Sequence, residues 1–480
     1  MRPKTLLILL VVVLGLGSFI WFYERKLPSS EKRAELEKRV LQEVEKDDVT
    51  AVTIEASKGT VRFERVEAAV KKDQKDDKDT EDAKDEEGET EAEEEAAPVA
   101  EWRLVRPVTA RADAFAVDRL LDSILALEKT RTIDDVDPKA VGLDKPRATV
   151  RLATKDGERV LKLGAEVPTG GALIAGIEGG KEGYVVADSI LFEMDKDPGE
   201  WRDRTIFRGD RETVQRITMT GASGRVVLAK RPDGFWIESP LVDRADRNLL
   251  DGLFSDLSGL TAERFLDNPG KPPGELGLAP PAATVEVVSA GAPPVKIELG
   301  GPVGNEATPE GQMAGELTYA RAGGPVFEVR TRLPESANRP PADWRALGLS
   351  AFEVHQIESV TVQDGAAPLA LTRAEPDWKR GDVTVSYLPV SDLVFTLTDA
   401  RADRLLAPAE ITLGKPVLTV VLKTKDAGEE TITLYPAAQG GVPARVGGRN
   451  VVLLLPADTL GQVRGKVAEV RNAKPVEEGK

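Results

Sequence analysis

The chain has 480 residues, of which 41% are hydrophobic and 30% are charged. This is the composition of a globular protein, and the length predicts about three domains because single cores rarely grow beyond roughly 250–300 residues. No cysteine is present, which excludes disulfides, thiolate catalysis, cysteine metal sites and an acylated lipoprotein anchor. The net charge of −16 would repel nucleic-acid phosphates, and the sequence has no basic stripe with interleaved aromatic residues, so no nucleic-acid binding is expected.

The N-terminus carries an uncharged apolar run from Thr5 to Tyr23. As a helix, these residues would span roughly 28 Å, close to the hydrocarbon core of a bilayer. The run ends in the bulky sequence FIWFY, whereas a signal-peptide cleavage site has small residues. We therefore predict an N-terminal tail and transmembrane anchor over 1–23, which contacts the bilayer through 5–23, and a juxtamembrane segment over 24–48. A signal peptide cut at an atypical site is the alternative.

The charges beside this run leave its orientation open. Arg2 and Lys4 precede the run, and six basic residues follow it between Arg25 and Arg39. The positive-inside rule applied to these counts places the body in the cytoplasm. A short basic tail ahead of an apolar run, as in a secretory signal, places the body on the other side.

A short motif of proline, two spacers, threonine and valine occurs three times, as PRATV, PAATV and PVLTV. Its prolines are 135 residues apart each time. Several tryptophans, prolines and aspartates recur with it, and we predict that all of them are structural anchors of one repeated module, because buried aromatic residues mainly hold cores together. The predicted anchors are Trp102, Pro107, Asp113, Pro146, Trp201, Trp236, Pro240, Asp246, Pro281, Trp344, Trp378 and Pro416.

Each copy predicts a hairpin, a strand, a helix, then further hairpins and a small helix. The helices of the first two copies follow Asp113 and Asp246, which are predicted N-caps, and both carry apolar residues at helical spacing. In the third copy the helical pattern is noisier, and Ser391 or Asp392 is the predicted cap. Short links between strands predict antiparallel pairing. We therefore predict an α+β protein with three tandem copies of a small antiparallel-sheet-plus-helix module on a single N-terminal transmembrane helix.

The predicted domains are module 1 over 49–207, module 2 over 211–349 and a divergent module 3 over 352–472, followed by a tail over 473–480. Module 1 contains an insertion over 67–100, which comparison with copy two places at a hairpin tip. Within it, residues 71–95 hold fourteen acidic residues and five lysines. This composition predicts disorder, and a solvated spacer is the expected role. A sponge for divalent cations is the alternative.

The basic tail, the apolar span, the segment DDVTAVTIEASKGTVRFERV, the W-x-L-x-x-P strand and GL-x-x-P before a strand together resemble the DUF4340 family. The resemblance is strongest over 1–207, good over 211–349 and thin over 352–472. It implies a bacterial protein anchored in the cytoplasmic (inner) membrane by a single pass, with its body in the periplasm or outside. Genes of the family often lie beside those of an ABC-2-type ATPase, its permease and a gliding-motility-type auxiliary protein. The family has no defined catalytic residues to carry over.

The sequence predicts no catalytic, cofactor-binding or metal-binding residues. His355 is the single histidine, and it has no recognisable serine and acid partners, so a polar linker role is expected. The sequence DKDPGE offers Asp195, Asp197 and Glu200 as the best metal candidate, but it lacks the full calcium-loop pattern, and a turn explains it equally well. We therefore expect no enzymatic activity and no cofactor.

These observations predict an extracytoplasmic interaction or scaffold protein, accessory to an ABC-type transport or gliding-motility-like complex. Its expected partners are integral membrane proteins, an ABC permease or an auxiliary subunit. The alternative is a protein that binds a ligand such as a glycan or peptidoglycan in a groove between modules, and exposed aromatic residues in such a groove would favour it. A hydrolase with an unrecognised carboxylate site is a remote alternative.

Overall fold

The computed structural model describes residues 36–42, 44–66, 101–304, 316–425 and 428–475. The predicted transmembrane anchor and the predicted acidic insertion lie outside the described residues. Within those residues, no helix is both long enough and apolar enough to cross a membrane. The chain divides into two compact units, Met1–Arg204 and Thr205–Lys480.

The first unit contains one nine-stranded antiparallel sheet with the strand order β4-β3-β2-β1-β6-β7-β8-β9-β5. Its strands are β1 (Val49–Ala56), β2 (Gly59–Val66), β3 (Glu101–Arg106), β4 (Ala110–Arg111), β5 (Arg131–Ile133), β6 (Ala148–Thr154), β7 (Gly157–Glu166), β8 (Ala172–Ile177) and β9 (Gly183–Ala187). Its helices are η2 (Lys46–Asp48), α3 (Ala114–Leu125), α4 (Ser189–Met194) and η3 (Pro198–Trp201).

The path of the chain explains this strand order. Strands β1 to β4 form a meander toward one edge, and α3 then carries the chain across the sheet to β5 at the opposite edge. Strand β6 returns to the centre beside β1, and β7 to β9 meander outward until β9 pairs with β5. The helix therefore covers one face of the sheet, and its apolar stripe is buried there. The buried residues of α3 are Val117, Leu120, Leu121, Ile124 and Leu125.

The second unit contains two further nine-stranded sheets whose strand orders repeat that of the first. The second sheet has β10 (Val214–Gly221), β11 (Gly224–Arg231), β12 (Gly234–Ser239), β13 (Asp243–Arg244), β14 (Ala262–Leu266), β15 (Ala283–Ser289), β16 (Val295–Pro302), β17 (Glu316–Arg321) and β18 (Val326–Thr331). Its helices are η4 (Arg211–Thr213), α5 (Arg247–Ser258), α6 (Leu333–Asn338) and η5 (Pro341–Trp344). Helix α5 lies along one face of this sheet, in the place that α3 has in the first unit.

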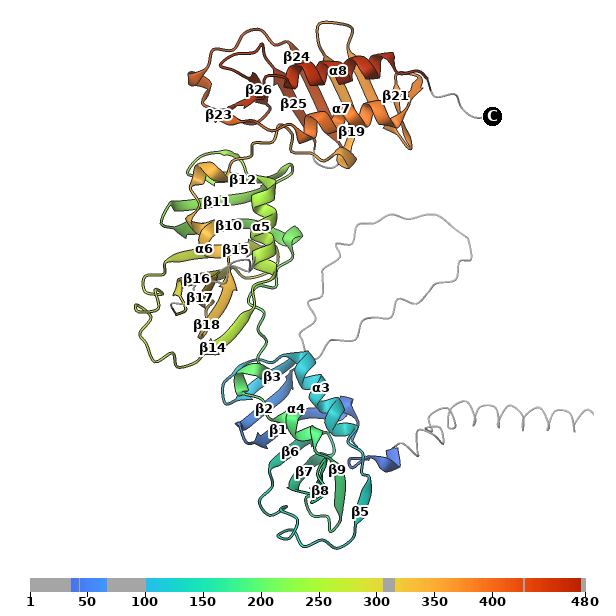
Figure 1. Ribbon diagram of the computed structural model, residues 1–480, viewed down its shortest axis with the longest axis vertical. Helices are drawn as coiled ribbons and strands as arrows, with labels where there is room; N and C mark the ends of the chain where they lie inside the picture. Colours follow the sequence, from blue (N-terminus) through green and yellow to red (C-terminus); the bar gives the residue numbers. More distant parts are fainter. Residues whose placement is uncertain (1–35, 43, 67–100, 305–315, 426–427, 476–480) are drawn as a thin grey trace, which may run out of the picture. The chain divides into compact units, whose positions relative to one another are not determined.

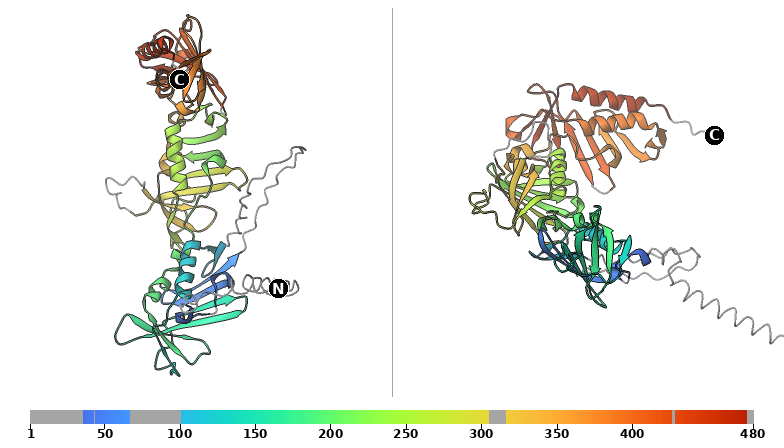
Figure 2. Two further views of the ribbon diagram at one scale, coloured as in Figure 1. Left: turned by 90° about the vertical axis from the view of Figure 1, so that its right-hand side faces the viewer. Right: turned by 60° about the horizontal axis from the view of Figure 1, so that its bottom comes forward.

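The third sheet has β19 (Ile357–Gln363), β20 (Leu369–Ala374), β21 (Asp377–Arg380), β22 (Val383–Val385), β23 (Arg404–Leu406), β24 (Leu418–Thr424), β25 (Glu429–Leu434), β26 (Val442–Val446) and β27 (Val452–Leu455). Its helices are η6 (Val354–Gln356), α7 (Tyr387–Asp399), η7 (Pro408–Glu410) and α8 (Thr459–Asn472). Helices α7 and α8 lie side by side on one face of the sheet (Figures 1 and 2). The longer α8 takes the place of the short helices that end the first two copies.

The predicted α+β class was wrong. Strands make up 44% of the structure and helices only 22%, so the repeats are sheet-rich modules of a mostly β protein. The error has a physical cause, because the strands at both edges of each sheet are short and lack a clear alternating pattern. The sequence therefore showed the hairpins but not the edge strands β4, β13 and β22, nor the strands β5, β14 and β23 that pair across the helix crossover.

The repeated proline motif has the same place in all three sheets. Each proline lies two residues before the central strand that returns beside the first strand of its sheet, namely β6, β15 and β24. Proline suits this place because the ladder of hydrogen bonds has not yet begun. A further repeated feature is a β-bulge near the start of each first strand, seen as the register shifts at Val49/Ala51, Val214/Arg216 and Ile357/Ser359.

Two glycines near the ends of β7 and β16, Gly164 and Gly300, lie against backbone. A Cβ atom at Gly164 would come within 2.3 Å of the Val141 carbonyl oxygen, and one at Gly300 within 2.2 Å of the Leu276 carbonyl oxygen. Any side chain at either position would displace the loop that precedes the central strand. The two loops therefore pack in the same way in both copies.

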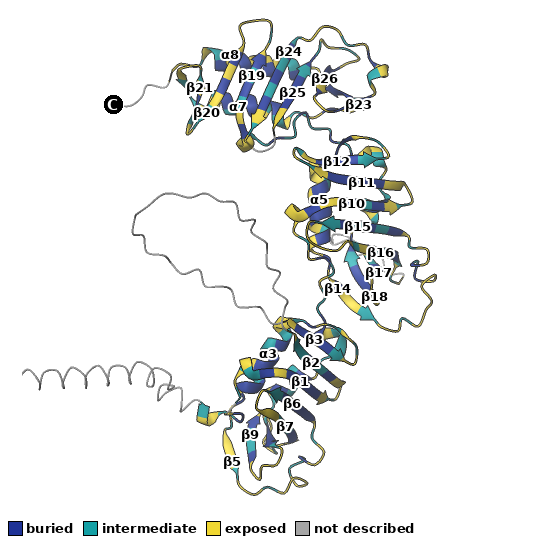
Figure 3. Ribbon diagram, turned by 180° about the vertical axis from the view of Figure 1, so that it is seen from behind, coloured by how far each residue is buried: buried dark blue, intermediate teal, exposed yellow. Residues whose placement is uncertain are grey.

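Each sheet has its own hydrophobic core between one face and the helices that cover it. Figure 3 shows more buried residues in the central strand β1 than in β5 at the edge of the same sheet. In the first core, the Trp201 ring meets the edge of Phe63 at a centroid distance of 5.4 Å. Trp344 and Trp378 are among the largest fully buried side chains of the other two cores.

Candidate functional site

The predicted anchors lie in matching places. Trp102, Trp236 and Trp378 lie in the third strand of their sheets and are no more than 3% exposed, while Trp201 and Trp344 end matching 3-10 helices and are no more than 1% exposed. Pro107 and Pro240 follow β3 and β12 in the first two copies.

Both predicted N-caps of the first two copies are present. The Asp113 carboxylate accepts a hydrogen bond from the Ala116 amide, and the Asp246 carboxylate accepts from the amides of Asn248 and Leu249. In the third copy the prediction was wrong, because α7 begins at Tyr387, before both predicted caps. The Tyr387 amide donates instead to the Asp377 carboxylate of β21, so the cap comes from a neighbouring strand.

The metal candidate DKDPGE is engaged in local structure. Glu200 accepts from the Asp197 amide in a capping box at η3, and Asp195 accepts from the Ser57 hydroxyl at the tip of the β1–β2 hairpin. Among the described residues, no group of three or more acidic or histidine side chains is arranged to hold a metal ion. Glu200 therefore caps a helix, and Asp195 holds the tip of a hairpin.

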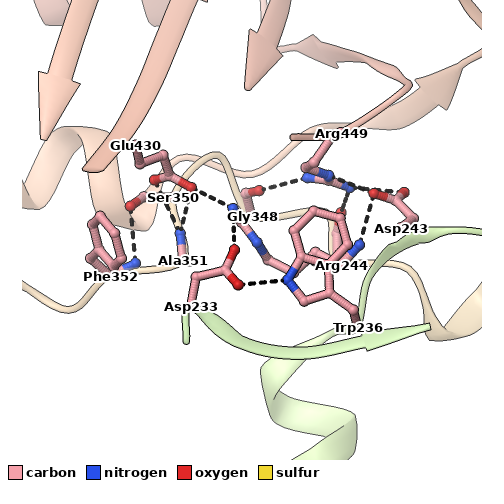
Figure 4. Close-up of polar contacts among 11 residues, drawn as sticks. Asp233, Trp236, Asp243, Arg244, Gly348, Ser350, Ala351, Phe352, Glu430 and Arg449 are labelled. Carbon is pink, nitrogen blue, oxygen red and sulfur yellow. Dashed lines mark hydrogen bonds and ion pairs between the residues drawn. The ribbon is translucent and has the colours of Figure 1, made fainter. Parts of the chain in front are cut away.

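A buried cluster of charges joins the second and third sheets, and sequence reasoning did not find it. Asp243 of β13 has no exposed surface, and it accepts from Arg449 of the β26–β27 turn through Nε at 2.7 Å and Nη2 at 3.1 Å. The Asp243 carboxylate also accepts from Arg345 Nε at 2.8 Å and from the Arg244 backbone amide at 2.9 Å. Figure 4 shows Arg449 reaching from the third sheet to Asp243.

The electrostatics of Asp243 follow from these contacts. Burial by itself would raise the pKa of the Asp243 carboxyl, because it disfavours the charged form. The hydrogen bonds and charges of Arg449 and Arg345 outweigh burial, so the pKa lies below its usual value. The carboxylate therefore stays ionised between two arginines, and it ties the end of β13 to the third sheet.

A second buried pair lies beside the first. Arg244 Nη2 donates to the Glu430 carboxylate of β25 at 2.6 Å, and these side chains are only 7% and 3% exposed. Glu430 also accepts from the Ala351 amide in the chain between the two sheets (Figure 4). Trp236 lies against Gly448 at the same place, since a Cβ atom at that glycine would be 3.5 Å from the indole. We call Asp243, Arg244, Glu430 and Arg449 the junction cluster.

The sequence offered one signal for the junction cluster. The repeat aligns Asp243 with Ala110 and Glu430 with Val295, so these charges occur in one copy at positions that are apolar in another. A charged residue at a position that another copy fills with an apolar side chain indicates a contact specific to that copy. The sequence did not reveal the pairing of Asp243 with Arg449, because these residues are 206 positions apart.

A groove with a volume of about 770 Å³ lies beside the junction cluster. The turn between β11 and β12 and the start of α5 line one side, while η6 and α7 line the other. Its size lies within the range of ligand sites, roughly 300–1,000 Å³. Two aromatic side chains of α7, Tyr387 at 41% and Phe395 at 58% exposure, line the groove. They are uncovered apolar surface in an otherwise charged wall.

Ion pairs across the groove link its two sides. Arg247 of α5 lies 2.6 Å from Glu353 beside η6, and Arg401 beyond α7 lies 3.1 Å from the capping residue Asp246. His355 is 74% exposed in the side chain, and its Nδ1 lies 3.0 Å from Glu353. His355 also lines the groove, and it lies in the segment between the second and third sheets, where the sequence predicted a polar linker residue.

Comparison with known proteins identifies a family. No curated protein matches the chain, and no solved structure does. The family model described as "Domain of unknown function (DUF4340)" matches twice, over residues 102–243 and 236–416. Each match begins at a third-strand tryptophan and runs into the next sheet, so the unit of the family is out of phase with the sheets. The two matches cover more than half of the sequence, and the chain therefore belongs to the DUF4340 family.

Proposed function

We propose that the chain is an interaction protein that holds a segment of a partner protein in the groove between the second and third sheets. The observation that carries this proposal is the exposure of Tyr387 and Phe395 in a groove whose two walls are tied by the buried junction cluster. Aromatic side chains are enriched at protein interfaces, where they contribute a large share of binding energy. A wall held by buried ion pairs keeps the groove formed before the partner arrives.

The wider context of the proposal comes from the sequence. The family resemblance suggests an ABC permease or an auxiliary subunit as the partner, in a transport or gliding-motility-like complex. The position of the body outside a bacterial cytoplasmic membrane, with the bilayer contacted through residues 5–23, stays a prediction. A reporter fused after Lys480 tests this prediction. If a reporter that works only in the cytoplasm is found to be active, the body does not lie outside.

A photo-crosslinking experiment tests the groove itself. A photoreactive phenylalanine analogue replaces Phe395 in cells that carry the native partners, and the crosslinked products are identified by mass spectrometry. The matched control places the same analogue at Phe192 of α4, which is 80% exposed but lies in the first unit. We expect a discrete partner protein at position 395 and not at 192. The same products at both positions, or none at 395, would contradict the proposal.

The second candidate is a glycan-binding protein, and the same two aromatic side chains favour it. Sugar rings commonly stack on exposed aromatic faces, and Tyr387 also offers a hydroxyl group. A ligand that binds only the folded state stabilises it, and the stabilisation grows with the logarithm of the ligand concentration once that exceeds Kd. A rise in melting temperature with peptidoglycan fragments, lost on Phe395→Ala, would favour this candidate over the partner protein.

A further inference from the structure

Arg231 is a cation in the groove without an acidic partner. It ends β11, is partly exposed and lines the groove. Its guanidinium carbon lies 4.6 Å from the centre of the Trp236 ring, which holds the side chain in place. Among the residues that the structure describes, no carboxylate comes within ion-pair distance of Arg231. A fixed guanidinium of this kind is prepared to accept a negatively charged group.

Arg244 adds a second incompletely paired cation beside the same ring. The residue is only 6% exposed, it lines the groove, and its guanidinium carbon lies 5.8 Å from the Trp236 ring centre. Nη2 is bonded to Glu430 and lies 3.8 Å from Asp233, while Nε and Nη1 have no hydrogen-bond acceptor among the described residues. Buried donors almost always have an acceptor in native proteins. Both donors are buried, so Arg244 contributes positive charge beside Trp236, whereas the partly exposed Arg231 is the guanidinium that a ligand can reach.

The charge of the groove agrees with this. Six of its lining residues are arginine or lysine and five are aspartate or glutamate, which leaves a charge of +1 when His355 is neutral. The chain as a whole carries −16, of which −9 lies in residues 71–95, so the lining of the groove differs in sign from the rest of the chain.

We propose that Arg231, with the positive charge of the buried Arg244 near it, binds a carboxylate group in an internal acidic segment of the partner protein. This inference rests on the proposed function and names the chemistry of the segment. Tyr387 and Phe395 cover an apolar side chain next to that carboxylate. A small anion alone would leave the aromatic surface uncovered. The open groove does not require the bound chain to end there. An internal peptide segment therefore fits better than a small anion or a chain terminus.

The first test uses the crosslink at position 395 as its readout. Arg231→Gln removes the charge while leaving Arg244 and its bond to Glu430 intact. The matched control is Arg225→Gln, which makes the same change at the exposed other end of β11, outside the groove. We expect Arg231→Gln to lower the crosslink yield by about tenfold or more, as for a lost charge-assisted hydrogen bond, and the control to leave it unchanged.

Two outcomes separate this inference from the proposed function. If the crosslink forms in the wild type and survives both Arg231→Gln and Arg231→Glu at full yield, the groove binds a partner but the carboxylate assignment is overturned. If the crosslink never forms, the proposed function itself fails. Unchanged melting temperature of each variant shows that a lost crosslink reflects binding and not unfolding.

The second test offers the purified full-length chain a mixed library of eight-residue peptides. Retained peptides are quantified by mass spectrometry for the wild type, Arg231→Gln and Arg225→Gln. We expect peptides with an internal aspartate or glutamate next to an apolar residue to be enriched by the wild type and the control, and not by Arg231→Gln. Equal retention of acidic peptides and their amide counterparts would overturn the inference, and enrichment of free C-termini alone would assign the site to a chain end.

Discussion

Replacing Asp243 by asparagine should open the junction between the second and third sheets. The change keeps the shape of the side chain but removes the charge that faces Arg449 and Arg345. Arg449 has a side chain with 0% exposure, so it would be left as a buried cation without a counter-charge. Breaking a buried ion pair in this way costs about 3–5 kcal/mol. Because each 1.4 kcal/mol is a factor of ten, we expect the junction to open roughly a hundredfold to several-thousandfold more often.

Hydrogen exchange measures this opening directly. The amides of Ala346 and Ala351 report on it, since Ala346 donates to the Arg244 carbonyl oxygen and Ala351 to the Glu430 carboxylate. Both amides should exchange faster in Asp243→Asn by the factor given above. The control is Glu238→Gln, which breaks the half-exposed pair with Arg216 at 2.8 Å and should cost less than about 1 kcal/mol.

A double variant separates charge from packing. Replacing Asp243 and Arg449 by apolar residues, Asp243→Leu with Arg449→Met, removes the fully buried charge that the single change leaves behind, while Arg345 is 21% exposed in its side chain and can reach water. Such replacements are often neutral or stabilising by about 1–4 kcal/mol, so slow exchange should return. Acceleration below about tenfold in Asp243→Asn, or equal acceleration in Glu238→Gln, would refute the assignment of the junction cluster as the element that joins the two sheets.

Three further predictions concern pH and the insertion. The pKa of Asp243 is lowered, so its contribution to stability is complete above the usual aspartate pKa of about 3.9 and is lost as the pH falls through the lower folded value. The melting temperature should therefore fall below about pH 4, and it should fall less in Asp243→Asn. Burial and then the hydrogen bond to Glu182 raise the pKa of Tyr184 to about 12, so ultraviolet titration should show one late tyrosine that shifts to lower pH in Glu182→Gln. Deletion of 67–100 should leave the melting temperature unchanged when a short glycine turn replaces it, because Val66 and Glu101 are direct partners in the β2–β3 ladder, and a fall of several degrees would contradict this.

Residues that repeat along the chain could be read from the sequence because each acts within its own copy. The 135-residue period placed equivalent prolines before equivalent central strands, and the caps Asp113 and Asp246 were identified correctly. These signals depend on local backbone geometry, namely the start of a strand or the first turn of a helix. Local geometry is encoded within a few residues, so one sequence is enough to reveal it.

The exposed residues of the groove left a weaker trace. Phe395 is 58% exposed and lies off the buried stripe of α7. Its presence helped to make the helical pattern of the third copy look noisy. Apolar residues that break an amphipathic pattern therefore carried the signal of a surface, but the sequence alone could not distinguish such a surface from a poorly formed helix.

The tertiary structure decided the class of the fold and the location of the groove. Strand β5 belongs to the sheet only because β9, more than 50 residues later, supplies its partner, and its own three residues have no strand pattern. Asp243 and Arg449 belong to one site only because two sheets meet, and on the sequence each was one charge among 146 charged residues. Pairing between distant segments depends on how the whole chain closes upon itself. For that reason the sequence by itself determined the repeat and its local anchors, whereas the sheet edges, the junction cluster and the groove appeared only in three dimensions.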